Sequence, residues 1–218
     1  MKKIMMIAAM MVATLSANAQ NEVGQFTLKP TVGINIAKVT KLDDSKTRAG
    51  LLAGVEAEYG VAENFGITAG LFYSMQGGKQ DWGTGKVYVD GIPATYNATL
   101  TWKTDYLNIP IMAQYYVIKG LAVKAGIQPG FCVSKKATLE QAGSYAGEAE
   151  YSKETQKLKG DYETGIKSFA FAIPVGLSYE YANFVLDARY NIGLTKVAKD
   201  FNGKHSVFSI SLGYKFAL

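Results

Sequence analysis

The feature that most constrains the fold of this chain is an alternation of apolar residues with small or polar ones. In Phe65–Gln76, one set of alternate positions is apolar throughout, and the other is mostly glycine, serine, threonine and glutamine (FGITAGLFYSMQ). Successive side chains of a β-strand point to opposite faces of a sheet, so this pattern predicts a strand with one apolar face. No apolar stripe of helical period is sustained along the chain.

The same alternation recurs along the chain and predicts an all-β protein of eight strands. In the longest of them the apolar parity switches by one residue near Asp105–Leu107, which indicates a β-bulge. The predicted strands are Phe26–Ala37, Leu51–Tyr59, Phe65–Gln76, Tyr96–Val117, Leu121–Ser134, Phe169–Tyr181, Phe184–Leu194 and Val207–Leu218.

Short and long connections alternate strictly between these strands. This is the pattern of an antiparallel up-and-down barrel with short turns at one end and long loops at the other, and it places both termini at the short-turn end. The short turns are Gly60–Asn64, Ile118–Gly120 and Ala182–Asn183, and the long loops are Lys38–Gly50, Gly77–Thr95, Lys135–Ser168 and Thr195–Ser206.

The N-terminal segment has the three parts of a secretory signal peptide. Lys2 and Lys3 precede the apolar run Ile4–Leu15, and Ala17-Asn18-Ala19 is a small-residue cleavage site. A retained anchor helix is the alternative, but the apolar run is shorter than the roughly 20 residues that a transmembrane helix needs. We therefore expect cleavage between Ala19 and Gln20, with a signal peptide over residues 1–19 and one barrel domain over residues 20–218.

The polar face of the alternation decides between a soluble barrel and a membrane barrel. A soluble ligand-binding barrel places apolar side chains inside, whereas an outer-membrane barrel turns them towards lipid and keeps polar groups inside. A narrow interior accepts glycines and paired charges but not a full row of aromatic rings. We therefore predict a transmembrane barrel with a network of ten charged residues inside: Lys29, Glu56, Glu58, Lys103, Asp105, Lys124, Glu180, Asp187, Arg189 and Lys215.

Aromatic residues fall into two groups along the predicted strands, one at each end. Two such girdles mark the two membrane interfaces of a barrel, and they support insertion in the outer membrane, in contact with its lipid. The group beside the short turns is Tyr59, Phe65, Tyr115, Tyr179, Tyr181, Phe184 and Phe216; the group towards the long loops is Tyr73, Trp102, Phe131, Phe169, Tyr190 and Phe208.

Several segments resemble the porin-family, PorT-like outer-membrane β-barrel domain of Gram-negative bacteria. The most specific is Tyr106-Leu107-Asn108-Ile109-Pro110, and others are KPTVGINIAKV, AGLLAGVEAEYGV, ITAGLFYSMQGGK and IPVGLSYEYANFVLDARYNIGLTKV. The terminal SISLGYKF resembles the signal that the barrel assembly machinery reads, which makes that machinery an expected partner during insertion. The resemblance implies the barrel fold. The functions of this family range from porin to a component of a protein-secretion system.

Composition excludes several kinds of chemistry. The chain has one cysteine, Cys132, and one histidine, His205, so disulfide frameworks and histidine-pair motifs are excluded. A formal charge of +5 is too weak and too scattered for nucleic acid. A hydrolase site would need His205 with Asp200 and Ser206, which are close only in sequence, and no metal-ligand or cofactor motif occurs. We expect no catalytic site, no cofactor and no metal, and an unreactive Cys132 facing the interior.

The remaining hypotheses concern binding and transport. The loops Gly77–Thr95, with Trp82 and Tyr88, and Lys135–Ser168, with mixed charges, offer surfaces for a protein or glycan partner. We therefore expect a structural or interaction role through extracellular loops. The alternatives are a small-solute channel, which eight strands make too narrow, and an accessory component of an outer-membrane secretion system.

Overall fold

The computed structural model describes residues 23–41, 45–145, 148–157, 165–198 and 202–218, and within these ranges it is built of β-strands and turns. The predicted signal peptide, with its cleavage site at Ala19 and Gln20, lies outside the described residues. Cleavage there stays a prediction.

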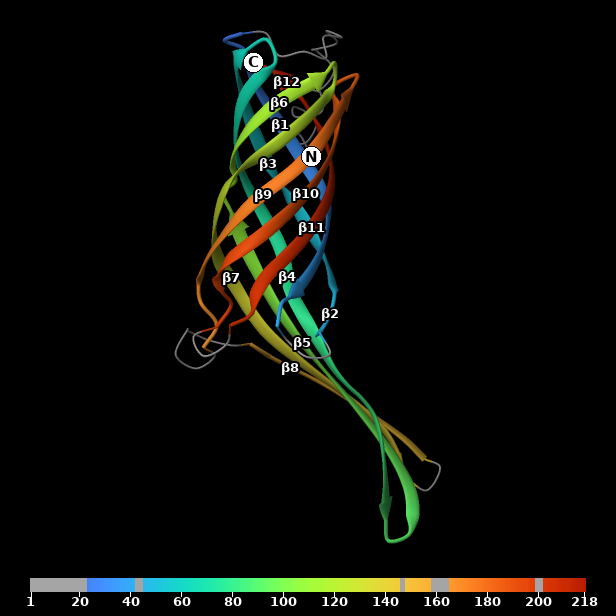
Figure 1. Cartoon of the computed structure of the whole chain (residues 1–218). Coiled ribbons are helices and arrows are strands. Elements are labelled where there is room, and N and C mark those ends of the chain that lie inside the picture. The colour runs from blue at the N-terminus through green and yellow to red at the C-terminus, as the bar shows by residue number, and fades with distance from the viewer. Residues whose placement is uncertain (1–22, 42–44, 146–147, 158–164, 199–201) are drawn as a thin grey trace, which may run out of the picture.

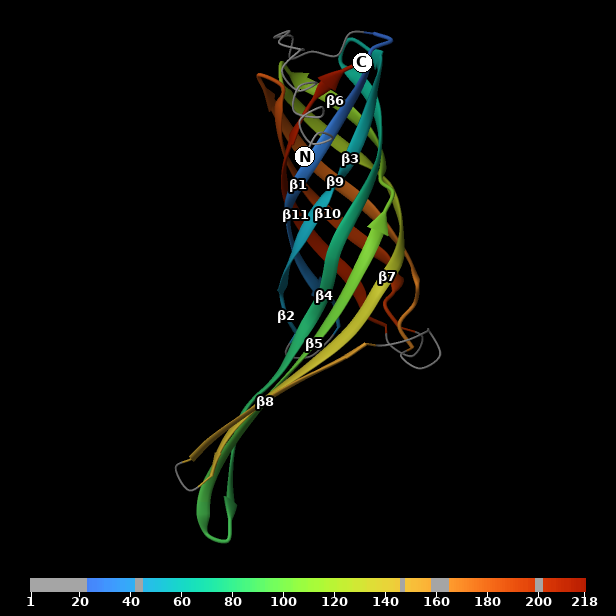
Figure 2. The same ribbon diagram turned by 180° about the vertical axis from the view of Figure 1, so that it is seen from behind.

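Strands at eight positions close into a ring, which confirms the predicted all-β barrel (Figures 1 and 2). All neighbouring strands are antiparallel, and β1 closes the ring by pairing with the last two strands. In ring order the strands are β1 (Phe26–Val39), β3 (Arg48–Ala62), β4 (Phe65–Val89), β5 (Ile92–Asn108) continued by β6 (Ile111–Ile118), β7 (Leu121–Tyr145), β9 (Phe169–Tyr181), β10 (Phe184–Lys196), and β11 (Lys204–Tyr214) continued by β12 (Phe216–Ala217).

The short turns lie at one end of this ring, together with the C-terminus. Ala182 and Asn183, which join β9 to β10, both have positive φ angles of 48° and 68°, as a two-residue hairpin of type I′ requires. The amide of Leu218 donates to the carbonyl of Phe26 at 2.9 Å, so the C-terminus lies beside the start of β1.

The alternation in the sequence corresponds to opposite surfaces of the ring. On β10, Leu186 points outward and is 52% exposed, whereas its neighbour Val185 is 3% exposed. The outward row of the ring is mainly apolar, and most of the buried charged and amide side chains lie inside. A water-facing surface would have the opposite distribution, so the barrel presents its outer wall to lipid.

Glycines let the interior accommodate a few large side chains. A Cβ atom added at Gly54 would lie 2.2 Å from the carbonyl oxygen of Leu71 and 2.7 Å from the ring of Phe72. Phe72 is 3% exposed and lies across the space that side chains on Gly54 and Gly70 would occupy. The glycine-rich face is therefore a packing requirement of a narrow barrel.

The structure corrects the prediction for two of the four long loops. Most of Gly77–Thr95 belongs to β4 and β5, and most of Lys135–Ser168 that the structure describes belongs to β7 and to β8 (Glu148–Lys157). These strands pair beyond the ring in the order β4-β5-β7-β8, and the resulting four-stranded sheet projects far from one end of the barrel (Figures 1 and 2). We call this sheet the blade; its strands extend beyond Gly78 of β4. The short β2 (Ser45–Lys46) pairs with β4 near its base.

An irregularity lies where the parity switch predicts a bulge, but the extra residue is on the neighbouring strand. Asp105 pairs with Ser134 and Tyr106 with Cys132, so Val133 of β7 is left without an opposite residue. The β4–β5 ladder runs through this region without a shift. As a result β5 keeps its parity, and the apolar row that includes Trp102 continues the inner surface of the barrel instead of joining the outward aromatic girdle.

Pro110 explains the break between β5 and β6. Proline has no amide hydrogen to donate to a ladder. Ile109 still donates to the carbonyl of Pro129, and the carbonyl of Pro110 accepts from the amide of Gly70, both at 2.9 Å. The Tyr106–Pro110 segment therefore passes between two strands at the centre of the wall, with Tyr106 buried inside.

Candidate functional site

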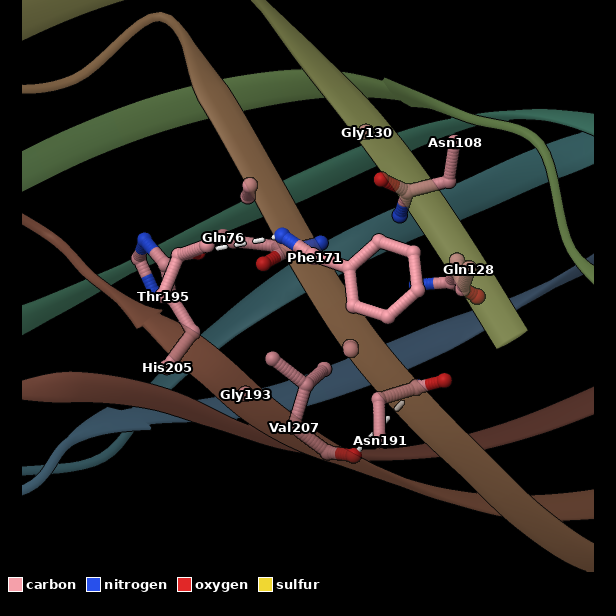
Figure 3. Close-up of a pocket in the computed structure, with 12 residues that line it drawn as sticks. Gln76, Asn108, Gln128, Gly130, Phe171, Asn191, Gly193, Thr195, His205 and Val207 are labelled. Atoms are coloured by element: carbon pink, nitrogen blue, oxygen red, sulfur yellow. Dashed lines mark hydrogen bonds between the residues drawn. The ribbon is translucent and has the colours of Figure 1, made fainter. Parts of the chain in front are cut away.

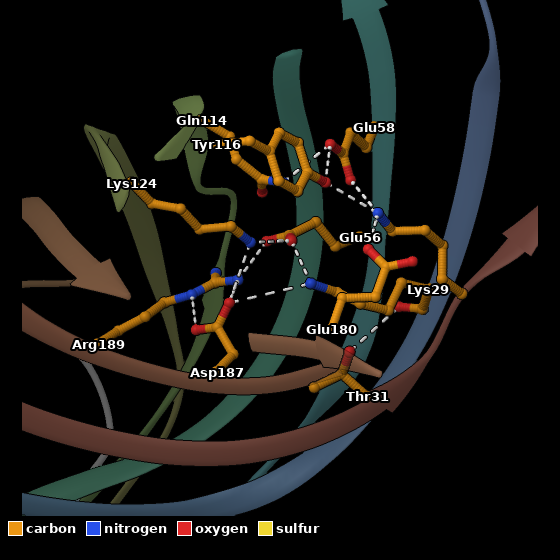
Figure 4. Close-up of polar contacts among 11 residues, drawn as sticks. Lys29, Thr31, Glu56, Glu58, Gln114, Tyr116, Lys124, Glu180, Asp187 and Arg189 are labelled. Carbon is orange, nitrogen blue, oxygen red and sulfur yellow. Dashed lines mark hydrogen bonds and ion pairs between the residues drawn. The ribbon is translucent and has the colours of Figure 1, made fainter. Parts of the chain in front are cut away.

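Five charged side chains from four strands meet inside the barrel (Figure 4). The register places Lys29 of β1 opposite Glu56 of β3, and their side chains approach to 2.7 Å. Lys124 of β7 lies 2.8 Å from Glu56 and 3.0 Å from Asp187. Arg189, two residues beyond Asp187 on the same face of β10, contacts both carboxylates. We call these residues the central ion cluster.

A second group lies nearer the short-turn end. The ammonium of Lys215 lies 2.5 Å from a carboxylate oxygen of Glu180 and 3.1 Å from one of Glu58. Tyr116 and Gln114 donate hydrogen bonds to Glu58 at 2.8 and 2.9 Å. Tyr116 and Gln114 are not among the ten predicted interior residues, although both occupy inward positions in the alternation of β6.

The two groups balance each other in charge. The central ion cluster holds three cations and two carboxylates, while the second group holds one cation and two carboxylates. Glu56 is 2% exposed and Asp187 is 1% exposed, so water gives these charges little screening. Buried charges persist only where partners replace their hydration, and these side chains supply that replacement to one another across the lumen.

The structure brings eight of the ten predicted interior charges together and leaves Lys103 and Asp105 apart. The carboxylate of Asp105 accepts a hydrogen bond from the hydroxyl of Tyr73 at 2.8 Å, on the outward side of β4 and β5. Among the described residues, Lys103 forms no ion pair. The cause is the retained parity of β5, which places both residues opposite outward positions of β4.

A small amide-lined hollow lies inside the barrel towards the blade end (Figure 3). Its lining includes Gln76, Asn108, Gln128, Asn191 and His205. The Nε2 atom of His205 lies 3.2 Å from the hydroxyl of Tyr106, and the two rings meet edge to face. The Nδ1 atom of His205 and the Oδ1 atom of Asn191 are buried with no hydrogen-bond partner among the described residues. Both atoms suit an internal water, which typically bonds to such groups.

The geometry around His205 does not assemble a hydrolase triad. Ser206 follows His205 on β11 and points to the other face, where its hydroxyl lies 2.7 Å from that of Tyr190. Asp200 lies outside the described residues. Cys132 donates a weak hydrogen bond to the carbonyl of Ser134. Within the described ranges, no three histidine, cysteine, aspartate or glutamate side chains are grouped to hold a metal ion.

The blade carries exposed aromatic and aliphatic side chains at its tip. Asp90 and Gly91 form the turn between β4 and β5, with φ angles of 52° and 80° that suit a type I′ hairpin. Tyr88 is 76% exposed and pairs with Pro93, while Val87, Val89 and Trp82 are also exposed. The sequence contains a signal for this hairpin, because Asp-Gly between β-forming residues indicates a two-residue turn.

One margin of the blade is formed by β4, which has β2 as its outer neighbour near the base. On one side, β2 pairs with β4 only at Lys79 and Gln80, so the β4 residues towards the tip have no paired strand beyond them among the described residues. An ion pair joins Lys46 to Asp81 at this base. The hydrogen bonds from Lys46 and from the amide of Gly83 hold the pKa of Asp81 below its ordinary value.

Among the described residues, no helix is both long enough and apolar enough to cross a bilayer.

One protein family and several solved structures are similar to this chain. The family model "outer membrane protein beta-barrel domain" matches residues 18–199. No curated protein matches the chain significantly. Solved structures that are similar include Ail, the attachment invasion locus protein of Yersinia pestis, at 15% identity and a TM-score of 0.44, covering 89% of this chain and 100% of that one. Neisserial surface protein A is similar at 13% identity and a TM-score of 0.40, covering 88% and 97%.

The family model spans most of the chain and the ring of strands inside which the ion pairs lie. The outward apolar wall and the buried charges are those of a barrel that crosses a bilayer. The chain belongs to the outer membrane protein β-barrel domain family and is an integral protein of the outer membrane.

Proposed function

We propose that this protein is a surface interaction protein, in which the barrel anchors the blade and the blade binds a partner outside the cell. The blade is the observation that carries this proposal. A barrel needs strands of about 9–11 residues to cross a membrane, whereas β4 and β7 each have 25. Long connections of such barrels lie on the extracellular side, which places the blade there.

The blade has the features of a recognition surface. It exposes Tyr88 and neighbouring aliphatic side chains at its tip and Trp82 nearer its base, and aromatic residues dominate the binding energy of many interfaces. Its β4 margin offers backbone groups to which an extended partner segment could add as a further strand. Both features favour a protein partner, and a glycan partner is the alternative outcome of the test.

The interior counts against a small-solute channel. The central ion cluster spans the lumen between β1, β3, β7 and β10, and eight strands leave a lumen that side chains fill. A PorT-like role in protein secretion would also act through contacts with other proteins, so it falls within the same proposal. Among the residues that the structure describes, His205 contacts Tyr106 while the hydroxyl of Ser206 points to the other face, which does not favour catalysis.

The test is capture of partners from membranes with and without the blade. Gln80, Leu100, Leu139 and Glu154 form one cross-strand row, so replacing Gln80–Leu100 and Leu139–Glu154 by two-residue turns removes complete rows and keeps the register below them. A second variant, the full-length Tyr88→Ser/Trp82→Ser, keeps the blade but removes its two exposed rings.

We expect crosslinking on intact cells to yield a discrete partner with the wild type and to lose it in both variants. Heat-modifiable migration on gels must show that both barrels are folded. An unchanged set of crosslinked partners in the bladeless variant would contradict the proposal.

A further inference from the structure

A cross-strand row of lysines lies at the base of the blade. Lys103 of β5 stands directly opposite Lys136 of β7, and Lys157 of β8 stands opposite Lys136 in the same backbone row. Side chains at directly opposed positions lie about 5 Å apart at Cβ, and like charges there destabilise a sheet. Lys79 of β4, two residues beyond Gly77, is exposed on the same side.

Among the described side chains, no carboxylate forms an ion pair with Lys79, Lys103 or Lys136. Of the two acidic side chains on this side of the blade, Asp81 binds Lys46, and Glu140 lies four residues beyond Lys136 towards the tip. The opposite side of β8 carries the remaining acidic residues of that strand, Glu148, Glu150 and Glu154, which pair in register with Tyr145, Gly143 and Leu139. The blade therefore has one basic side near its base.

The basic side continues the lipid-facing wall of the barrel. Lys103 lies two residues from Asp105 and therefore on the same side of β5. Asp105 is hydrogen-bonded by Tyr73, whose ring is 37% exposed on the outer wall. On the other side, Gly78 pairs with Trp102, and a Cβ atom on Gly78 would meet the buried side chain of Val39 at 3.3 Å.

The depth of the row matches the headgroup layer of a bilayer. Gly77, which pairs with Lys103, lies four residues beyond the girdle residue Tyr73. Four residues span about 13 Å along a strand, or about 9 Å along the membrane normal at a tilt of about 45°. The headgroup layer extends about 5–8 Å beyond the hydrocarbon core on each side, within reach of lysine side chains in this row.

We propose that Lys79, Lys103 and Lys136 form a binding site for the phosphate group of an anionic lipid of the outer leaflet. A phosphate among the three ammonium groups would cancel the like-charge repulsion of the row, since lysine binds phosphate as a point charge. The site is separate from the blade tip, so this proposal does not depend on the proposed interaction function.

The test measures lipid retention by the full mature protein, folded in maltoside micelles that contain a fixed fraction of dilauroyl phosphatidylglycerol or of zwitterionic dilauroyl phosphatidylcholine. Native mass spectrometry counts the lipids that stay bound. The variants are Lys103→Ser/Lys136→Ser, the charge-retaining Lys103→Arg/Lys136→Arg, and the single changes Lys79→Ser and Lys86→Ser. Lys86 is the matched control, because it is exposed on the same strand and side as Lys79 but lies towards the blade tip.

We expect the wild type to retain phosphatidylglycerol in preference to phosphatidylcholine. Each lysine lost near the headgroups should weaken retention about fivefold, so the double serine variant should lose at least about tenfold. The arginine variant and Lys86→Ser should retain the lipid as the wild type does. Heat-modifiable migration verifies folding of each variant.

Three results would overturn the proposal. The double serine variant could retain phosphatidylglycerol unchanged, or Lys86→Ser could lose as much as Lys79→Ser, which would indicate a general effect of charge. Saturable binding of inorganic phosphate to the wild type, together with equal retention of phosphatidylglycerol and phosphatidylcholine, would show a site for free phosphate instead.

Discussion

Replacing Glu56 with glutamine tests whether the central ion cluster holds the barrel together. Glu56 contacts Lys29, Lys124 and Arg189, and the substitution would leave these three cations around the single carboxylate of Asp187. All of these side chains are at least nine-tenths buried, so solvent cannot supply the missing charge. Removing one partner of a buried ion pair costs about 3–5 kcal/mol, and we expect the free energy of unfolding to fall by that amount.

The assay is urea unfolding in lipid vesicles, followed by heat-modifiable migration and by tryptophan fluorescence. The double variant Glu56→Gln/Lys124→Met removes one charge of each sign and restores the cluster's original balance. It should recover part of the loss, because contacting residues do not contribute additively. Lys46→Ser, which removes an exposed pair at the blade base, serves as the control with little effect.

A loss below about 1 kcal/mol for Glu56→Gln, together with additive behaviour of the double variant, would show that the central ion cluster does not hold the barrel together. Such values are those of exposed ion pairs, and they would mean that water reaches the cluster.

Three further predictions concern conduction, catalysis and packing. In planar bilayers, the wild type should give no reproducible salt-dependent single-channel conductance, and Lys124→Ala/Arg189→Ala should be more permeable to ions; reproducible wild-type channels would contradict a sealed lumen. His205→Ala should leave lipid and peptide turnover at the wild-type level, and loss of a turnover that the wild type shows would establish a catalytic role. Gly54→Leu should lower the yield of heat-modifiable barrel, because its side chain would collide with Phe72 and the Leu71 carbonyl, whereas Gly91→Asn at the blade turn should fold normally, since asparagine tolerates a positive φ.

The ring of strands could be predicted from the sequence because lipid and lumen impose opposite demands on every strand. In β9 and β10 the alternation is unbroken from Phe169 to Tyr181 and from Phe184 to Leu194, and the structure places strands over both ranges. Parity also assigned Lys29, Glu56, Lys124, Asp187 and Arg189 to one side. Which of them contact one another depends on register across several strands, and alternation within one strand does not specify it.

The blade could not be predicted from alternation, because beyond the membrane neither side of a strand has to be apolar. Gly77–Thr95 contains glycines and an irregular register between Asp81 and Thr84, both of which obscure a period of two. Asp90-Gly91 was the local sign of a hairpin. Lys103 and Asp105 were placed inside because the extra residue of the bulge, Val133, lies on β7, where parity within β5 gives no indication of it.

Spin-label accessibility can establish which face of the barrel wall meets lipid. Cys132→Ser gives a cysteine-free background, in which single cysteines at Ile67, Thr68, Leu71 and Ser74 carry the label in vesicles. We predict that labels at Ile67 and Leu71 collide with lipid-soluble oxygen, and that labels at Thr68 and Ser74 are shielded from it. Oxygen contact at Thr68 and Ser74, with Ile67 and Leu71 shielded, would mean that the apolar face lies inside, and it would contradict the account.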